Sequence, residues 1–448
     1  PESNLMLEAG AGAVTIDGAM GASKALGDLV INSTGATTLS GAVTAASVTT
    51  NSGGTIQVDG GQVTTTGAQS HGQAMMLGAD TTFSANNFSA AAINMSGYDL
   101  TVDDSGTGSI GGVVSGSGSA FVKEGAGTLT LSGVNTYTGA TTISTGTLKL
   151  ANTNASSQYS IAASSVLELY VDSGTRDLPT VTFSGAGVLR KTGAGAISTE
   201  SGVATFDLSD SALLDIQAGL FGTGGFSNDD LSSNESDLNV AAGAIFSISD
   251  NDAYFDAVTG GGTIRMGYQN DNQFIVGIGG SSGQFDGVFQ DTGWNSGSGI
   301  LNLVKQGAGT LTLTASSTYT GSTTVSAGTL KAGASTAGAV TNGPFGTGTV
   351  TVATGATLDV AGFDIANAMI LSGSGLGGSG ALYNSSVLAA TASGDIQLAA
   401  DSTVGATGAL SLGDVSGNYA LDSQNTGLVT FLGDVGSSAA RLSSLSAS

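Results

Sequence analysis

The chain has 448 residues with a formal net charge of -24, because 34 acidic side chains face only 10 basic ones. This balance argues against a nucleic-acid partner, since phosphate neutralisation needs clustered Lys and Arg, and against an anionic membrane surface for the same reason. Charged residues make up 10% of the chain, below the roughly 25% of ordinary soluble domains. The 73 glycines, with abundant Ala, Ser and Thr, favour many short strands joined by tight turns.

The absence of cysteine fits two compartments. Cytosolic proteins rarely form disulfides, and a chain that must cross a periplasm and an outer membrane unfolded also gains from having no cysteine. The start, PESNLMLEAG, lacks the basic and apolar segments of a signal peptide. No segment approaches the roughly 20 apolar residues of a membrane helix. The chain begins on Pro1 rather than on methionine and ends RLSSLSAS with no closing motif, so we expect a processed or excerpted piece of a longer protein.

The first regular segment, residues 27–68, has a short apolar strand about every seven to ten residues with turn signals between them. Helix signals are weak throughout the chain, and only ASKALGDL, residues 22–29, indicates a short helix. Similar strand spacing returns at residues 345–365, in FGTGTVTVATGATLDVAGFDI. The coarse pattern is therefore all-β.

A longer segment of the sequence occurs twice. KEGAGTLTLSGVNTYTGATTISTGTLKL, residues 123–150, aligns without gaps with KQGAGTLTLTASSTYTGSTTVSAGTLKA, residues 305–332. A weaker third start, LRKTGAGAIST, lies at residues 189–199 and keeps the Lys-x-Gly-Ala-Gly pattern. Fixed internal repetition of this kind usually indicates a solenoid or an array.

Inside the repeat, Leu129 and Leu131 alternate with threonines, which is the period of a strand with one buried face. Glycines such as Gly127 and Gly146 stand at the corners between strands. Strands this short predict a parallel β-helix, whose coils of roughly 20–25 residues stack about 4.8 Å apart into a rod on the order of 90 Å long.

The repeat resembles the passenger-associated repeat of bacterial autotransporters, at residues 125–148 and less strictly at 307–330. The resemblance implies a right-handed parallel β-helix that is exported across a Gram-negative outer membrane to the cell surface. It implies no single activity, since passengers include adhesins, proteases, lipases and toxins. The second copy departs from the family pattern at residues 315–317, which read as a corner.

We predict one elongated β-helix over residues 1–448. Residues 1–151 should form regular coils with the first repeat, and residues 299–448 regular coils with the second. Residues 152–298 should form less regular coils with acidic loops, the densest at 227–237 and 249–256.

Catalytic motifs are weak in this chain. Gly279 to Gly283 match the Gly-x-Ser-x-Gly nucleophile elbow, but the elbow needs a strand-to-helix turn and a histidine partner. The one histidine, His71, lies in GAQSHGQA, which reads as a turn, and we expect it to be an ordinary surface residue. Two Gly-x-Gly-x-x-Gly segments, residues 106–111 and 373–378, do not open a helix and read as coil corners.

Acidic side chains offer the remaining chemistry. A carboxylate pair could cleave glycosidic bonds with help from Arg265, and the same loops could hold calcium. The candidate carboxylates are Asp229, Asp230, Asp250, Asp252 and Asp256. The shortage of His, Lys and Arg around them favours solvated loops over an enzyme.

Three aromatic residues could bind a ligand. Tyr137 and Tyr319 occupy equivalent places in the two copies and could stack on sugar rings, although covering the core at a corner is the stronger interpretation. Trp294 is the only tryptophan and suits either a binding anchor or the core.

The sequence thus predicts a non-catalytic, extracellular structural or adhesive stalk of a Gram-negative cell surface. No catalytic, cofactor-binding or metal-binding residue is assigned, and no cofactor is expected. Host or matrix glycans and proteins are possible partners. Two alternatives stay open: a filament subunit that stacks through open coil ends, and a polysaccharide-processing enzyme that uses the acidic loops.

Overall fold

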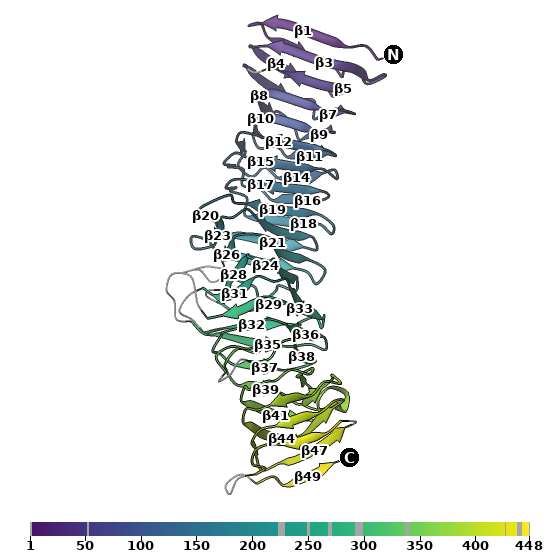
Figure 1. The fold of residues 1–448 in the computed structure, drawn as a ribbon. Coiled ribbons are helices and arrows are strands. Elements are labelled where there is room, and N and C mark those ends of the chain that lie inside the picture. Colours follow the sequence, from purple (N-terminus) through teal and green to yellow (C-terminus); the bar gives the residue numbers. More distant parts are fainter. Residues whose placement is uncertain are drawn as a thin grey trace. The chain divides into compact units, whose positions relative to one another are not determined.

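The computed structural model describes residues 2–51, 53–222, 229–248, 251–267, 271–291, 299–336, 340–425, 427–436 and 441–447. The chain forms two compact units. Unit 1 comprises Pro1–Ile197 with Ser201–Leu213, and unit 2 comprises Ser198–Glu200 with Leu214–Ser448. Both consist of short strands stacked in successive coils (Figure 1). The predicted all-β parallel β-helix is confirmed.

The strands up to β24 belong to unit 1, except that β23, like β25 below, includes residues of both units. They are β1 (Leu5–Gly10), β2 (Val14–Ile16), β3 (Leu26–Ser33), β4 (Ala36–Leu39), β5 (Val43–Thr50), β6 (Thr55–Val58), β7 (Gln62–Thr65), β8 (Gln69–Leu77), β9 (Thr81–Ala85), β10 (Phe88–Asn94), β11 (Leu100–Asp104), β12 (Thr107–Ile110), β13 (Val114–Ser115), β14 (Phe121–Glu124), β15 (Thr128–Leu131), β16 (Thr141–Ile143), β17 (Thr147–Leu150), β18 (Gln158–Ile161), β19 (Val166–Tyr170), β20 (Thr175–Asp177), β21 (Val181–Gly185), β22 (Val188–Thr192), β23 (Ala196–Ser198) and β24 (Ala204–Leu208).

The later strands lie in unit 2, apart from the first residue of β25. They are β25 (Leu213–Ile216), β26 (Leu220–Gly222), β27 (Asp237–Val240), β28 (Ile245–Ile248), β29 (Ala253–Phe255), β30 (Val258–Thr259), β31 (Thr263–Met266), β32 (Asn272–Val276), β33 (Gly283–Phe285), β34 (Val288–Gln290), β35 (Leu301–Lys305), β36 (Thr310–Leu313), β37 (Thr323–Val325), β38 (Thr329–Ala332), β39 (Val350–Val352), β40 (Thr357–Asp359), β41 (Met369–Gly373), β42 (Leu382–Asn384), β43 (Ala390–Ala392), β44 (Ile396–Ala406), β45 (Leu410–Leu412), β46 (Val415–Ser416), β47 (Ala420–Asn425), β48 (Val429–Phe431) and β49 (Ser444–Ala447).

The short helix indicated at residues 22–29 is wrong. Residues 21–24 form a bend, and β3 begins at Leu26. The apolar residues of ASKALGDL join the strand because β3 pairs in parallel with β1 and β5 on either side, and those ladder bonds outweigh a weak helical preference. In the described part of the chain, the regular helix is a single 3-10 turn, η2 (Leu376–Gly378).

Parallel ladders run from coil to coil in unit 1. One ladder joins β15, β17 and β19, and it aligns Leu129 with Leu148 and Leu148 with Leu167, 19 positions apart each time. The second ladder, through β14, β16, β18, β21 and β24, forms another side of the same coils. Most backbone groups are thus paired without side-chain help, as a buried backbone requires.

The core follows the two-residue period of the sequence. In β15, Leu129 and Leu131 are buried and the threonines between them are half-buried. Aligned leucines therefore stack in a column, and burying each stabilises the fold by about 1.5–3 kcal/mol. Aromatic rings form a similar column in unit 1, where Phe183 lies 5.5 Å from Tyr159 and 5.6 Å from Phe206 between ring centroids.

Unit 2 uses the same ladders with more variable coil lengths. The second repeat aligns Leu311 with Leu330, 19 positions later, but Leu330 aligns with Leu358, 28 positions later. The extra residues leave the strands in register because they are placed at corners. The predicted division of the chain at residues 151 and 298 stays a prediction.

Acidic and amide side chains close many corners. Asp80 Oδ1 accepts the backbone N–H of Asp99 at 2.9 Å, and Asp99 Oδ1 accepts that of Ala120 at 2.8 Å, each one coil further on. In unit 2, Asp401 and Asp414 do the same for Ala420 and Asp434. Part of the acidic composition therefore stabilises corners, in addition to keeping the surface soluble.

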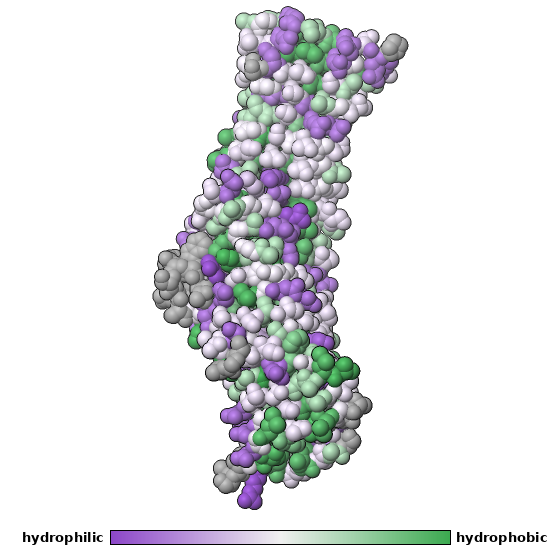
Figure 2. Space-filling view, in the orientation of Figure 1, coloured by the Kyte–Doolittle hydropathy of each residue, from purple (hydrophilic) through white to green (hydrophobic). Residues whose placement is uncertain are grey.

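The visible surface is mostly of intermediate hydropathy, as expected from outward Thr, Ser and Gly (Figure 2). A more hydrophobic area covers unit 2 in the region of β41 to β49. The most exposed large apolar side chains there are Val387, Leu388, Leu428 and Leu432, which are 82%, 66%, 68% and 65% exposed.

Candidate functional site

Unit 1 contains an open hollow of about 510 Å³ between the corners of two successive coils. One wall comes from Ala151 to Thr153, directly after β17, and the other from Val171 to Ser173, directly after β19. Strand β20 closes the hollow with Thr175, Arg176 and Asp177. Polar side chains from three segments thus meet at one place.

The hollow exists because the coil length changes there. Thr141 aligns with Tyr159, 18 positions later, whereas Tyr159 aligns with Phe183, 24 positions later. The longer coil contains β20, and the shorter coil before it has no strand in the equivalent segment, residues 151–157. A uniform solenoid has flat sides, so this step in coil length creates a ledge.

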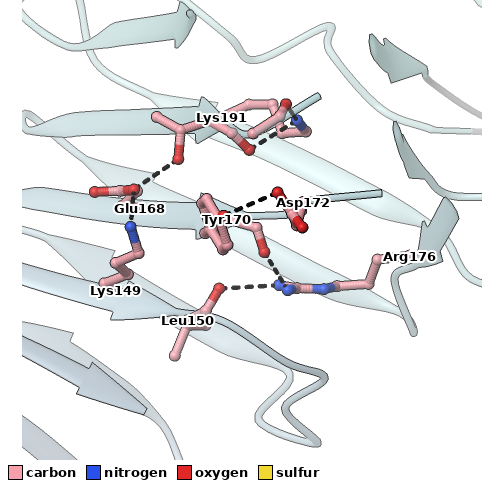
Figure 3. Close-up of polar contacts among 9 residues, drawn as sticks. Lys149, Leu150, Glu168, Tyr170, Asp172, Arg176 and Lys191 are labelled. Carbon is pink, nitrogen blue, oxygen red and sulfur yellow. Dashed lines mark hydrogen bonds and ion pairs between the residues drawn. The ribbon is translucent and has the colours of Figure 1, made fainter. Parts of the chain in front are cut away.

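Arg176 ties the two coils together at the base of the hollow (Figure 3). Its Nη1 donates to the Leu150 carbonyl at 3.1 Å, and its Nη2 donates to the Tyr170 carbonyl. Burial lowers the pKa of the Arg176 guanidinium, but an arginine stays charged at any physiological pH. The residue therefore acts as a fixed cation that bridges the ends of β17 and β19.

Tyr170 and its neighbours form a hydrogen-bonded network on the outer face beside the hollow (Figure 3). The Tyr170 hydroxyl donates to Asp172 Oδ1 at 3.1 Å, and this bond raises the pKa of the phenol. Lys149 Nζ lies 4.2 Å from the ring centroid, a cation–π contact, and 2.9 Å from Glu168 Oε1. Burial raises the pKa of Glu168, but the hydroxyl of Thr192, donating at 2.6 Å, and the Lys149 ammonium lower it below its usual value.

This arrangement is suited to binding. Asp172, Ser173 and Thr175 are exposed at the rim, and they offer hydrogen-bond acceptors and donors to a polar ligand. The described lining contains no histidine or cysteine that could act as a base or nucleophile near neutral pH. Sequence reasoning missed this site, because its signal is the coil length rather than any motif.

Three buried lysines each close a corner, and sequence reasoning also missed them. Lys123 and Lys305 lie on equivalent strands of the two repeats, β14 and β35, whereas Lys191 lies on β22, in the ladder that contains β17 and β19. Lys123, Lys191 and Lys305 are at most 1% exposed, and each donates to the carbonyls of the next two residues. Burial lowers the pKa of Lys191 and of Lys305 to about 8. The signal was present: strand alternation from Phe121 and from Leu303 puts the following lysine on the inward face.

A comparison with protein families covers two of these three corners, those of Lys123 and Lys305. A family model described as the passenger-associated-transport-repeat matches residues 121–150 and 303–332. The chain carries this passenger repeat twice. Each match begins within the strand that contains a buried lysine, β14 or β35, and ends with β17 or β38. The resemblance to an autotransporter passenger repeat family is thereby confirmed.

The other comparisons add no relative. No curated protein and no solved structure matches the chain. Among the described residues, no helix is long and apolar enough to span a membrane, and no cluster of three or more His, Cys, Asp or Glu side chains is placed to hold a metal ion.

Tyr137 and Tyr319 cover the core of the two passenger repeats, as the stronger interpretation predicted. Both are fully buried, so neither ring can stack on a sugar. The Tyr137 hydroxyl bonds Thr141 Oγ1 at 2.8 Å and accepts a hydrogen bond from Asn154 Nδ2 at 2.7 Å. Among the described residues, the Tyr319 hydroxyl bonds Thr323 Oγ1 alone, at 2.7 Å. Burial raises the pKa of Tyr137 to about 12 and that of Tyr319 further. Trp294 lies outside the described residues.

We expect the two tyrosines to differ when the hydroxyl is removed. Tyr137→Phe leaves the buried Asn154 amide without its acceptor and should lower the free energy of unfolding by about 1–2 kcal/mol. Tyr319→Phe should cost less than about 1 kcal/mol, because Thr323 Oγ1 also donates to the Phe345 carbonyl at 3.2 Å. Hydrogen exchange of the two repeats measures both; equal losses would contradict this prediction.

Two of the candidate carboxylates of unit 2, Asp256 and Asp229, are buried and accept hydrogen bonds from neighbouring segments. Asp256 is 1% exposed, and its Oδ1 accepts the N–H groups of Gly279 at 2.8 Å and Ser281 at 3.1 Å. Asp229 is 2% exposed and accepts the Thr199 hydroxyl. No ion pair joins Arg265 to a carboxylate among the described residues, and burial lowers its pKa.

Asp230 and Asp252 do come together, at an open hollow of about 270 Å³ that Tyr254 also lines. Asp230 Oδ1 accepts the backbone N–H and the hydroxyl of Ser232, and these bonds lower the pKa of Asp230. A general acid in glycoside cleavage needs a raised pKa, so Asp230 is shifted in the wrong direction. Asp252 Oδ1 accepts the Gln273 N–H at 2.7 Å. Asp250 lies outside the described residues.

Substituting Asp256 separates a structural role from a catalytic one. Asp256→Ala removes the acceptor for two N–H groups and should cost about 1–3 kcal/mol of stability. Asp256→Asn keeps an oxygen at the same place and should cost less. Denaturant unfolding of both variants tests the order, and an alanine variant as stable as the asparagine variant would contradict it.

The serine motif lies at a corner. Gly279 to Gly283 connect β32 to β33, with no helix following among residues 271–291, and the backbone N–H of the motif serine, Ser281, donates to Asp256 Oδ1 at 3.1 Å. His71 is buried in unit 1, with ring centroids 5.7 Å from Phe83 and 5.9 Å from Phe88. The interpretation of His71 as an ordinary surface residue is wrong, because the alternation of β8 places it on the inward face.

The two glycine fingerprints also belong to coil geometry. Gly106 to Gly111 flank and include β12, which pairs with β15. This segment is therefore largely a strand, and the prediction of a corner holds only at its ends. Gly373 to Gly378 end β41 and form the 3-10 turn η2, too short to present a helix N-terminus to a dinucleotide.

Proposed function

We propose that the chain is a non-catalytic segment of an exported passenger, a β-solenoid stalk that serves a structural or adhesive role outside a Gram-negative outer membrane. One observation carries the proposal: both passenger repeats lie within continuous coil-to-coil ladders. A backbone ladder of this kind is rigid and needs little side-chain chemistry. The repeat family favours export to the cell surface or the extracellular space.

The side chains support a non-enzymatic role. The Asp256 carboxylate accepts the backbone N–H of Ser281 at a corner, and the Asp230 carboxylate accepts that of Ser232. Each is occupied in holding its own loop, and none is arranged as a nucleophile with a base.

The proposal is tested on cells that produce the protein naturally. Antibodies raised against the chain should label intact cells, or the medium should contain the protein. Labelling that requires permeabilised cells, with none in the medium, would overturn it. An antibody to a cytosolic protein is the control for leakage.

Association into filaments is a second candidate. Strand β49 pairs with β47 and exposes all four of its residues, and Leu445 within it is 53% exposed. Exposed apolar side chains of this kind can contact a second copy of the chain. Electron microscopy across a concentration series tests it: fibres that lengthen with concentration support the filament, and single particles throughout contradict it.

A further inference from the structure

We propose that the hollow beside Tyr170 in unit 1 binds a neutral glycan. The proposal rests on the proposed extracellular function, which it deepens by naming a ligand class. The hollow has a volume of about 510 Å³, within the range of about 300–1,000 Å³ typical of ligand sites. This volume gives room for a short oligosaccharide segment.

The rim presents the mixture of groups that sugar hydroxyls require. Asp172 offers carboxylate oxygens as acceptors, and Ser173 and Thr175 offer hydroxyls that both donate and accept; all three side chains are exposed. Bonds from sugar hydroxyls to an ionised carboxylate are among the stronger neutral-ligand contacts. These groups come from adjacent positions on a rigid ledge.

Hydrogen bonds of Arg176 and Tyr170 hold the site in a fixed arrangement before a ligand binds. Arg176 fixes the carbonyls of Leu150 and Tyr170, so the two coil corners are held at a set separation. The Tyr170 hydroxyl holds Asp172 Oδ1 at 3.1 Å, while the Lys149 ammonium lies over the Tyr170 ring. Tyr170 itself does not line the hollow. It is a positioning residue that acts through Asp172. Because these contacts hold the side chains of the site in place before binding, the protein loses little conformational entropy when a ligand binds.

Charge selects a neutral ligand. Asp172 and Asp177 both line the hollow, against the single cation of Arg176, whose guanidinium already donates to two carbonyls. The chain as a whole carries -24. A uronate, sialate or sulfate would therefore be repelled by nearby carboxylates and by the long-range field, whereas hydroxyl groups would not.

The purified full chain tests the proposal on an array of neutral gluco-, galacto- and manno-oligosaccharides printed beside their sialylated, sulfated and uronate counterparts. The strongest neutral binder is then titrated calorimetrically. Asp172→Ala should weaken binding at least tenfold, and Thr175→Val about threefold. The matched control is Asp207→Ala, an exposed aspartate on β24 away from the hollow, which should leave the affinity unchanged.

The role of Tyr170 needs a double-mutant cycle. Tyr170→Phe alone should weaken binding about threefold to tenfold, but added to Asp172→Ala it should cause no further loss, since it acts through that carboxylate. Additive losses would assign Tyr170 a separate, structural effect and overturn its positioning role.

Three results would overturn the glycan site: no neutral oligosaccharide binds, acidic glycans bind better than neutral ones, or binding survives Asp172→Ala and Thr175→Val unchanged. Each is measured on purified protein and leaves the cell-labelling test of the proposed function untouched. Conversely, absence of the chain from the cell surface would overturn that function while binding stayed measurable.

Discussion

Gly127→Ala is expected to disrupt the coils around the first passenger repeat. A Cβ added to Gly127 would lie 2.0 Å from the Gly106 carbonyl oxygen and 2.6 Å from its nitrogen. Backbone on a neighbouring coil cannot rotate away as a side chain can, so the ladder must shift. We expect a loss of about 3 kcal/mol, at the upper end for overpacking, measured by urea unfolding.

The chain supplies matched controls for this substitution. Gly111→Ala places its Cβ where nothing lies within 4 Å, and Gly111 has no positive φ, so this variant should stay within about 0.5 kcal/mol of the parent protein. Gly309, at the equivalent corner of the second repeat, meets the Ser281 carbonyl oxygen at 2.2 Å and should behave like Gly127. Equal stability of the Gly127 and Gly111 variants would contradict close coil stacking at this corner.

Unit 1 should lose stability as the pH falls, through His71. Burial lowers the pKa of this imidazole from 6.5 to about 4. As the pH falls, His71 is therefore protonated near pH 6.5 in the unfolded chain but only near pH 4 in the folded chain. Between these pH values the unfolded state binds more protons, so the free energy of unfolding decreases as the pH drops. From these two values, the loss between pH 7 and pH 4.5 amounts to about 2 kcal/mol.

A variant isolates this contribution from the many carboxylates. His71→Met is similar in size and cannot be protonated, and it keeps contact with the Phe83 and Phe88 rings. The parent protein should lose about 2 kcal/mol more than this variant between the two pH values, as measured by denaturant unfolding. An identical loss in both proteins would show that His71 titrates normally.

The fold could be predicted because its signals are local. Alternation at Leu129 and Leu131 and the glycines between strands specify which face is buried and where the chain turns. The repeat at residues 123–150 and 305–332 indicates that the same local structure occurs twice. The predicted coil length of roughly 20–25 residues was too narrow, since the ladders accept offsets from 18 positions at Thr141 to 29 at Phe274.

The site could not be predicted, because it depends on which corners become neighbours. Thr153 and Thr175 line one hollow only after the coil lengths on both sides are known. The roles of charged residues were hidden for a similar reason. Asp256 looked like a candidate catalytic acid until its partners, N–H groups 23 and 25 positions later, were located. The burial of Lys305 follows only when the alternation of its strand is followed to the last residue.

The change of coil length in unit 1 also has a meaning for how such a chain evolves. Six additional residues between Tyr159 and Phe183 left the parallel register intact on both sides. The length of a corner can thus change independently of the core, because residues can be inserted or deleted at a corner while the stacked strands keep their register. A repeated scaffold of this kind can acquire new surface features one corner at a time, without passing through an unfolded ancestor.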